Sequence, residues 1–381
     1  MTDGLTKHEE EVLLARPVQS LLTASDRDAF AGRRCLITGA GGSVGSELAR
    51  QIASCTPAHL TVLDHSEHGL FSIERELREC HPDLALEAVL ADVTRTASMR
   101  AAVTRSRPEL VFHAAAYKHV TMAERAACAA ARVNVLGTAE LLTALRGTGA
   151  RFVLVSSDKA AAPTSVMGAT KRLAECLTVA HADLGLSPLV VRFGNVLASS
   201  GSFVALMLDR MRQGRPLQVT HVEATRYFMS LSEAASLVMK AATIGAAGET
   251  LWLDMGEQVR MGDLADRLQT IGVARGWPRV PVEHIGLRPG EKLVEQLVGE
   301  GVTETATVDP RIRVARTAHA AFWRWELTLQ ALRRRVALED GRGVLQTLRG
   351  AVEGFEPSEQ AWSMAGGWRV ETHAVRPART A

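Results

Sequence analysis

The sequence is poor in cysteine and in aromatic residues, and this scarcity argues against several classes of protein. Aromatic side chains make up 4% of the 381 residues, and there are 2 tyrosines and 5 cysteines. The cysteines, at positions 35, 55, 80, 128 and 176, are never spaced Cys-x-x-Cys. Their odd number and spacing argue against a disulfide framework or a zinc site, and indicate reduced thiols in a cytoplasmic protein without a metal centre.

A strong charge imbalance and long apolar runs are also absent. The formal net charge is +2, with 46% hydrophobic and 23% charged residues, as in ordinary globular proteins. This balance gives no reason to expect nucleic acid or an acidic membrane surface as a partner. No apolar run approaches the roughly 20 residues that span a bilayer. The acidic N-terminus also lacks the apolar centre of a signal peptide, so we expect no membrane partner.

Lysine is scarce beside arginine. It occurs only at positions 7, 118, 159, 171, 240 and 292. Because a guanidinium does not deprotonate in proteins, a chain that prefers arginine can keep lysine where it needs a titratable amine. On composition alone, chance explains the lysine positions equally well.

Short apolar runs alternate with segments of helical periodicity over the first half of the chain. This alternation predicts an α/β protein with a Rossmann-type, doubly wound parallel sheet of about seven strands. The expected strands are 33–40, 59–65, 85–93, 109–116, 151–157, 187–196 and 250–256.

The βα rhythm loosens after about residue 195, which indicates a second, smaller unit. We expect a helical arm over 1–30, a dinucleotide-binding Rossmann domain over 31–195 and a mobile tail over 363–381. Residues 196–362 are expected to form a substrate-binding lobe interleaved with the last strands. This segment ends in two amphipathic helices divided at EDGRG.

A glycine-rich stretch, TGAGGSVGSELARQ from Thr38, joins the first expected strand to a helix. Glycines let the backbone turn tightly and approach a pyrophosphate, and the helix N-terminus offers free N–H groups. The stretch therefore predicts dinucleotide binding, although a purely structural turn would also use glycine. The candidate residues are Gly39, Gly42, Ser43, Val44 and Gly45.

Acidic residues end the second and third expected strands. Asp64 follows the glycine loop by about 20 residues, as the rule for ribose binding requires, and its charge favours NAD over NADP. It could instead cap the next helix. Asp92 and Val93 are candidates for the adenine end, although Asp92 also suits a plain turn.

The fourth expected strand runs into HAAAYKHV, residues 113–120. Ala114, Ala115 and Ala116 leave room for a flat cofactor at the carboxyl edge of the sheet, where open α/β sheets bind ligands. Lys118 and His119 follow at the same crevice. A small-residue packing site with a solvated Lys-His pair is the alternative.

The fifth expected strand is followed by Ser157, Asp158 and Lys159 and then by a helix start, VMGATKR. Met167 and Lys171 lie one turn apart on one helix face. In short-chain dehydrogenases this geometry belongs to a tyrosine and a lysine. Neither tyrosine of this chain has a lysine four residues later, so no shifted copy of that motif exists. A surface ion pair and a core methionine are the alternative interpretation.

The ordered motifs TGAGGSVGSEL, HAAAYKHV, SSDKAAAPTSVMGATKR, VRFGNVLASSGSFV and GLRPGEKL resemble the extended short-chain dehydrogenases of polysaccharide biosynthesis. The resemblance covers roughly residues 10–360 and is closest to UDP-N-acetylglucosamine 4,6-dehydratases. Many members have methionine in place of the tyrosine. Longer members carry membrane helices ahead of a segment like LLARPV, so the resemblance implies a soluble short form, usually a homo-oligomer.

The resemblance also implies the chemistry. NAD accepts the C4 hydride of the sugar, water leaves across C5 and C6, and the hydride returns to C6. Asp158 would protonate the leaving 6-hydroxyl, and Lys159, with a lowered pKa, would take the C5 proton. Lys171 would hold the ribose. The proton of the 4-hydroxyl would pass to Asp158 or through Ser157, and Met167 would leave space beside the rings.

The resemblance extends to residues of the lobe that would bind the UDP-sugar. SSGSFV, at 199–204, would offer backbone donors, and guanidinium groups suit phosphate oxygens. RPGEK could instead be a rigid turn, and the neighbours of Arg226 look like core. The candidates are Lys118, His119, Asn195, Arg226, Arg260, Arg288 and Glu291.

Some positions near the expected sugar depart from the family pattern. Ser157 replaces a threonine, AAAP lacks an asparagine before its proline, and HVTMAER places Thr121 and Ala123 beside His119. These changes leave the exact sugar and any C5 inversion open. A nucleotide-sugar 4-epimerase and a catalytically silent NAD-binding protein are the alternatives to a dehydratase.

Overall fold

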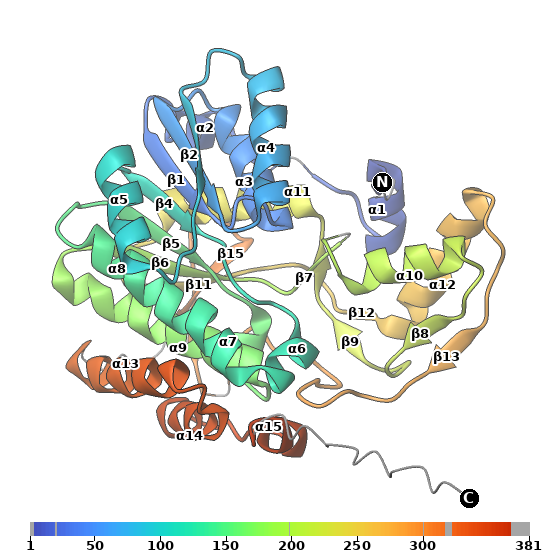
Figure 1. Ribbon diagram of the computed structural model, residues 1–381. Coiled ribbons are helices and arrows are strands. Elements are labelled where there is room, and N and C mark those ends of the chain that lie inside the picture. The colour runs from blue at the N-terminus through green and yellow to red at the C-terminus, as the bar shows by residue number, and fades with distance from the viewer. Residues whose placement is uncertain (1–3, 20, 198, 300, 317–321, 367–381) are drawn as a thin grey trace, which may run out of the picture.

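A nine-stranded sheet organises the chain, in the order β14-β15-β11-β6-β5-β4-β1-β2-β3 (Figure 1). The computed structural model describes residues 4–19, 21–197, 199–299, 301–316 and 322–366. Its nine strands are β1 Arg34–Thr38, β2 His59–Asp64, β3 Leu86–Leu90, β4 Leu110–His113, β5 Arg151–Val155, β6 Ser187–Arg192, β11 Thr250–Leu253, β14 Thr303–Ala306 and β15 Ile312–Arg316. Strands β3 to β11 in this order are parallel, whereas β15 and β14 pair antiparallel at the β11 edge.

This sheet confirms the predicted α/β class and the expected parallel strands. The two antiparallel strands were not expected, because they are short and β14 has a largely exposed, polar sequence. Antiparallel edge strands of this kind are common on otherwise parallel sheets.

Helices cover both faces of the sheet. The helical elements before the lobe are α2 Ala24–Asp28, α3 Ser43–Ala53, α4 Glu67–Cys80, α5 Thr96–Ser106, α6 Val120–Arg125, α7 Ala127–Ala131, η1 Arg132–Gly137, α8 Thr138–Leu145, η2 Asp158–Ala160, α9 Val166–Ala180 and η3 His181–Leu184. Alternate residues of β1 face opposite ways, with Ile37 in the cluster under α3 and α11 (Leu231–Ile244) and Leu36 in the cluster under α5 and α8. Because both faces are buried, the parallel strands read as continuous apolar runs.

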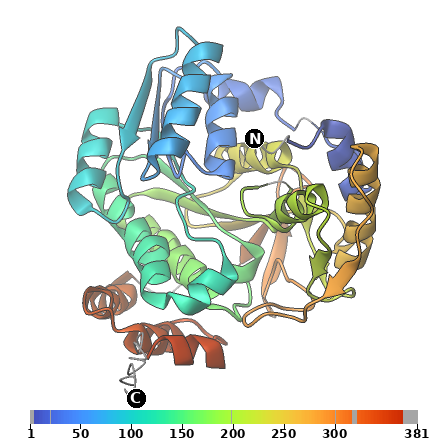
Figure 2. The ribbon, with the colours of Figure 1, turned by 45° about the vertical axis from the view of Figure 1, so that its right-hand side comes forward.

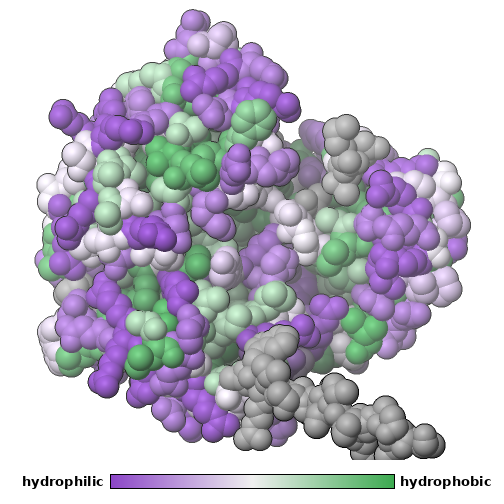
Figure 3. Space-filling model, in the orientation of Figure 1, coloured by the Kyte–Doolittle hydropathy of each residue, from purple (hydrophilic) through white to green (hydrophobic). Residues whose placement is uncertain are grey.

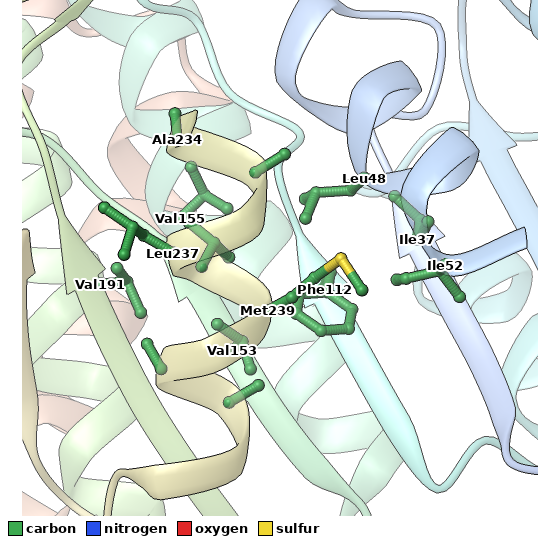
Figure 4. Close-up of a cluster of buried hydrophobic side chains, with 14 of the residues drawn as sticks. Ile37, Leu48, Ile52, Phe112, Val153, Val155, Val191, Ala234, Leu237 and Met239 are labelled. Carbon is green, nitrogen blue, oxygen red and sulfur yellow. The ribbon is translucent and has the colours of Figure 1, made fainter. Parts of the chain in front are cut away.

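Figure 4 shows the core on the α3 and α11 side. Leu48 and Ile52 of α3 are four residues apart on one helix face and pack against Ile37 and Phe112 of the sheet. Leu237 of α11 lies over the neighbouring strands. This packing fixes the N-terminus of α3 at the carboxyl edge of the sheet.

A smaller lobe stands beside this edge (Figure 2). Its elements are β7 Asn195–Val196, α10 Phe203–Arg212, β8 Leu217–Val219, β9 Thr225–Arg226, β10 Phe228–Met229, β12 Val259–Arg260, α12 Met261–Ala274 and β13 Val282–His284. The lobe has its own apolar cluster, which includes Leu13 and Leu14 of α1 (Lys7–Leu14). The expected arm 1–30 is therefore divided, since α1 packs on the lobe and α2 packs against α11.

The C-terminal helices lie against the sheet domain. They are α13 Phe322–Ala337, α14 Gly341–Ala351 and α15 Glu359–Met364. Their apolar side chains join those of α7 and α9 in one cluster, and α13 and α14 confirm the two helices expected around EDGRG. The expected tail 363–381 begins within α15, and its residues 367–381 lie outside the described residues.

One helical segment of the described chain, Ala127–Leu145, is long and apolar enough to cross a bilayer by length and composition. Its mean hydropathy is 1.2, and 72% of the window is buried inside the protein. Because this segment is packed between α9, α13 and the sheet, its apolar composition is that of a core helix.

Candidate active site

The candidate site lies where the strand order reverses. Strands β2 and β3 extend from β1 in one direction, and β5 and β6 extend from β4 in the other. The crevice at the carboxyl ends of β1 and β4 is the place where open α/β sheets bind ligands. Figure 3 shows a hollow between the sheet domain and the lobe on this side of the molecule.

The glycine loop after β1 is packed too closely for side chains. A Cβ on Gly45 would lie 2.0 Å from the carbonyl oxygen of Gly39, and one on Gly39 would lie 2.5 Å from the backbone nitrogen of Ala115. Gly39 also has a φ of 74°. Helix α3 follows directly, with Gly42 as its N-cap and no side chain bound to its first N–H groups. Those free donors, with Ser43 and Val44 in the first turn, fit a diphosphate.

Asp64 stands beside this loop with its carboxylate oriented by the backbone. Its two oxygens accept hydrogen bonds from the backbone N–H groups of Gly41, at 2.9 Å, and Ser66, at 2.8 Å. The N-cap of α4 is the hydroxyl of Ser66, so Asp64 is not the helix cap. Asp92 accepts from the N–H of Thr94, as a turn residue does, and Val93 next to it is buried.

The chemistry-bearing residues gather just after β5. Asp158 is 1% exposed, and one carboxylate oxygen accepts from the Ser157 hydroxyl at 2.8 Å and from Lys159 Nζ at 3.0 Å. The other oxygen, Oδ2, is buried without a hydrogen-bond partner. A Cβ on Gly194 would lie 3.2 Å from this oxygen and 2.9 Å from the Cβ of Tyr227, so the backbone at position 194 packs closely against the carboxylate.

The charge state of Lys159 differs from the expectation. Burial by itself lowers the pKa of Lys159, but the carboxylates of Asp158 and Glu295 outweigh burial and the net pKa is raised. Lys159 Nζ lies 3.6 Å from Glu295 Oε1, and Glu295 is buried. The predicted lowered pKa is therefore wrong for the free protein, in which Lys159 is an ammonium held by two carboxylates.

Lys171 has the shifted pKa that a buried amine shows without a close carboxylate. Burial lowers its pKa to about 8, and Glu175 offsets part of this effect. Its Nζ donates to the carbonyl of Val155 at 2.6 Å, at the end of β5.

Met167, one turn before Lys171, is 2% exposed within the apolar cluster of α7, α9 and α13. That burial supports a packing role for Met167.

A loop of the lobe reaches across to the sheet domain. The backbone N–H of Ser200 donates to the Ser43 hydroxyl at 2.9 Å, and Lys118 Nζ donates to the Ser199 hydroxyl at 3.3 Å. A Cβ on Gly201 would lie 2.8 Å from the His119 ring. The SSGS segment thus contacts the glycine loop, Lys118 and His119, and the last two follow Ala114, Ala115 and Ala116 closely in the chain.

The remaining lobe candidates have different surroundings. Arg226 donates to the carbonyls of Thr225, Lys292 and Leu293, so its guanidinium serves the lobe itself and does not fit a phosphate ligand. Asn195 Nδ2 donates to the carbonyl of Tyr227 at 3.3 Å, and Arg260 is paired with Glu223 at the lobe surface.

The RPGEK segment forms the rigid turn that was the alternative interpretation. Glu291 closes this turn by accepting from the backbone N–H of Arg288 at 3.1 Å. Gly290 packs against Ser165, the N-cap of α9, and its carbonyl accepts from Thr164. The exposed Arg288 side chain is therefore held beside the start of the helix that carries Met167 and Lys171.

The sequence reasoning missed Glu295 and Gly194. Glu295 lies 136 positions after its partner Lys159, in a stretch with no periodicity, so no local signal marks it. Gly194 was visible in RFGNV as a glycine beside a strand end, which signals close approach of another group. Within the described residues, no group of three or more His, Cys, Asp or Glu side chains could hold a metal ion.

Comparisons with known proteins match this architecture. The capsular polysaccharide biosynthesis protein CapD of Staphylococcus aureus is 37% identical over 322 residues, which cover 83% of this chain and 53% of that protein. The probable polysaccharide biosynthesis protein EpsC of Bacillus subtilis is also 37% identical, over 80% of this chain and 52% of that protein. The chain thus spans about half the length of these relatives. A UDP-glucose 4-epimerase of Rickettsia canadensis is 33% identical over 71% of this chain and 78% of the epimerase.

Solved structures share the fold. The structure of Pen from Bacillus thuringiensis superposes with a TM-score of 0.69 at 27% identity, over 77% of this chain and 91% of that one. A dTDP-glucose 4,6-dehydratase of Streptomyces venezuelae, DesIV, crystallised with NAD, has a TM-score of 0.61 at 22% identity, over 70% and 88% of the two chains. The model of the family described as "Polysaccharide biosynthesis protein" matches residues 35–317. The family model and the relatives at 37% identity show that the chain belongs to the polysaccharide biosynthesis protein family.

Proposed function

We propose that the protein is a nucleotide-sugar 4,6-dehydratase that uses and internally recycles NAD. The observation that carries the proposal is the Asp158–Lys159 pair that follows β5, in which one buried carboxylate oxygen of Asp158 has no hydrogen-bond partner. An elimination across C5 and C6 needs a base for the C5 proton and an acid for the leaving 6-hydroxyl, and this pair would supply both.

The residues around the crevice fit NAD. The glycine loop and the α3 N-terminus would hold its diphosphate, Asp64 its adenosine ribose and Lys171 its nicotinamide ribose. When bound, NAD supplies reversible hydride acceptance from C4 and return to C6 of the sugar. A Cβ at Gly39 or Gly45 would fill the cradle or displace its backbone, which is why these positions are glycine.

The pair can supply a closed proton cycle for this reaction. Asp158 Oδ2 accepts the proton of the 4-hydroxyl when C4 is oxidised, and the resulting carboxylic acid then protonates the leaving 6-hydroxyl. Neutral Lys159 takes the C5 proton in the same elimination and later returns a proton to C5. The protein ends each turnover with the protons it started with, and water is the only loss.

This cycle requires that Lys159 lose its proton before turnover. The ion pair in the free protein holds one proton more than the competent state, because Asp158 and Glu295 raise the pKa of Lys159. Binding of the anionic diphosphate would not favour proton loss, so the cycle depends on the ambient pH. Catalysis should therefore increase as the pH rises toward the pKa of Lys159.

The substrate that the family resemblance implies is UDP-N-acetylglucosamine. Incubation with this compound in deuterated water should give a 4-keto-6-deoxy sugar that carries deuterium at C5, detected by NMR. Asp158→Asn and Lys159→Ala should lose most of this product, whereas Met167→Leu, which conserves volume in the core, should retain activity. Failure to form such a product from any of several nucleotide sugars would refute the proposal, and tight NAD binding without product would favour a silent NAD-binding protein.

A 4-epimerase is the second candidate, because one relative at 33% identity is named UDP-glucose 4-epimerase. Epimerisation oxidises and re-reduces C4 only, so it has no use for a base at C5. Full turnover of UDP-glucose to UDP-galactose by Lys159→Ala, without solvent deuterium at C5, would favour the epimerase.

A further inference from the structure

A second cavity lies at the opposite edge of the sheet from the candidate active site. It has a volume of about 760 Å³ and is bordered by the amino ends of β1, β4, β5 and β6. Because these strands are parallel, their amino ends face away from Asp158 and the glycine loop. The volume is in the range of sites that hold small organic ligands. The lining residues are Ala29, Phe30, Arg33, Val103, Thr104, Arg107, Pro108, Glu109, Leu110, Ala144, Thr148, Gly149, Ala150, Arg151, Ser187, Ala242 and Thr243.

The charge of this cavity is positive. Three guanidinium groups, those of Arg33, Arg107 and Arg151, line it, against one carboxylate, that of Glu109. Arg33 donates a hydrogen bond to Glu109 at 2.6 Å, and this bond is the main reason that the pKa of Glu109 is lowered. The carboxylate is therefore ionised and already paired with Arg33. Arg33 and Glu109 therefore offset each other, which leaves Arg107 and Arg151 as the excess charge.

The two remaining arginines have unused donors. Arg107 ends α5 with an exposed side chain, for which the described residues provide no ion pair or hydrogen bond. Arg151 Nη1 reaches the Ser187 hydroxyl only at 3.5 Å and another terminal nitrogen donates to the carbonyl of Gly245, but its Nε is buried without a partner. Burial lowers the pKa of Arg151, and the nearby carboxylate of Glu249 only partly opposes this effect.

A buried N–H donor on a cation is costly unless an acceptor meets it. Guanidinium groups bind phosphate oxygens in a forked geometry, and threonine and serine hydroxyls add further donors. Thr104 and Ser187 supply such hydroxyls around the arginines, whereas the Thr148 hydroxyl donates to the carbonyl of Leu145, and the apolar part of the lining includes Phe30 and Leu110. A phosphate-bearing small molecule with an apolar portion matches both parts of this lining.

We propose that this cavity, at the amino ends of β1, β4, β5 and β6, is a binding site for a phosphate-bearing small molecule, held by Arg107 and Arg151. The site is separate from the nucleotide-sugar site. Arg151 begins the strand that Asp158 follows, so a ligand here contacts the far end of the element that positions the catalytic pair.

Inorganic pyrophosphate titrated into the NAD-loaded full chain by calorimetry tests the proposal. Arg107→Gln should weaken its binding about tenfold, the value of one charge-assisted hydrogen bond. Thr104→Glu, which adds a carboxylate to the lining, should abolish it. Arg100→Gln removes the same charge from the same helix outside the cavity, and Arg288→Gln removes it from the candidate substrate site, so neither should change the affinity at this site.

Three outcomes would overturn the proposal. One is no binding to the wild-type protein at millimolar pyrophosphate. Another is an equal loss in Arg107→Gln and Arg100→Gln, which would show unspecific attraction by charge. The third is a loss in Arg288→Gln but not in Arg107→Gln, which would place the anion in the substrate site. Repeating the titration with a nucleoside monophosphate separates ligands with an apolar portion from free inorganic phosphate.

Discussion

At the residue scale, the candidate site depends on how two buried carboxylates and one half-buried amine share charge. Asp158, Lys159 and Glu295 contain two carboxylates and one amine, and Ser157 donates to the same oxygen of Asp158 that Lys159 contacts. Because the amine is held between the carboxylates, its protonation depends on both of them. Glu295 forms ion pairs with Lys159 and Arg226, so we expect it to act through Lys159 as a positioning residue.

Glu295→Gln should move the pH dependence of turnover to lower pH. The Glu295 carboxylate raises the pKa of Lys159, and the amide keeps the shape of the side chain without the charge. Neutral Lys159 should then form at lower pH, and the rising limb of kcat/KM should shift toward lower pH. Product formation measured between pH 6 and 10 tests this. An unshifted limb with a lower plateau would show that Glu295 has only a structural role.

Lys171→Met should stabilise the fold at neutral pH while it weakens NAD binding. Lys171 titrates near 8 in the folded protein and near 10.5 when unfolded, so the unfolded state binds more protons between these values and stability rises with pH there. Below about pH 8 the buried ammonium of Lys171 destabilises the wild-type fold by about 3 kcal/mol. The substitution removes this penalty, but it also removes the hydrogen bond to the carbonyl of Val155, which is worth roughly 1 kcal/mol. Urea unfolding of both proteins should show the largest difference at pH 7 and little at pH 10.5. A difference independent of pH would contradict this.

At the scale of single elements, the glycine loop and helix α3 act as one unit. The carbonyl of Gly39 packs directly against the backbone of Gly45, and Gly39 packs against the backbone of Ala115, which follows β4. Helix α3 can therefore begin only where a residue without a side chain passes the Gly39 carbonyl. The local turn fixes the direction in which the free N–H groups point.

Gly45→Ala should disrupt this unit more than Gly42→Ala. The new Cβ at position 45 would lie 2.0 Å from a backbone oxygen that no side-chain rotation can move, whereas at position 42 the nearest atom is 3.3 Å away. We expect a loss of roughly 1–3 kcal/mol in stability and of NAD binding for Gly45→Ala, and less than about 1 kcal/mol for Gly42→Ala. Thermal unfolding and NAD fluorescence titration measure these effects. Equal losses would show that the close approach is relaxed in solution.

At the scale of the whole molecule, contacts distant in sequence join the lobe to the sheet domain. Helix α1 packs on α12 through the ion pair of Glu9 and Arg275, and Arg16 reaches Glu233 at the start of α11. Ser43 and Ser200 join the two parts again at the site itself. The relative position of the lobe, and hence the width of the candidate site, depends on these few contacts.

The neighbouring acids of α1 should have opposite effects on its attachment. The hydrogen bond from Arg275 lowers the pKa of Glu9 to about 2, so its stabilisation is present above pH 4.5 and is lost as the pH falls toward 2. Burial, Glu233 and Glu47 raise the pKa of Glu10 to about 7, so its destabilisation develops between pH 4.5 and 7. At pH 8, hydrogen exchange of residues 7–14 should be faster in Glu9→Gln and slower in Glu10→Gln. The same direction in both variants would refute this assignment.

Sequence periodicity was sufficient to predict the seven parallel strands of the central sheet but not its two antiparallel edge strands. These seven strands were predicted because strands buried on both faces are continuous apolar runs, and α9 begins at the VMGATKR segment where a helix start was expected. The glycine loop, Asp158 and Lys159 could be found for a related reason. Each lies directly at the end of a predictable strand, where a parallel sheet collects its functional residues.

The sequence by itself determined the class of the fold, the nucleotide-binding edge and the acid-amine pair, because these follow from local pattern. Only the tertiary structure decided the charge of Lys159, the internal role of Arg226 and the attachment of α1 to the lobe. Those properties depend on groups far apart in the chain, such as Glu295 beside Lys159, and electrostatic energies depend on distance in space and on burial. Neither quantity can be read from spacing along the chain.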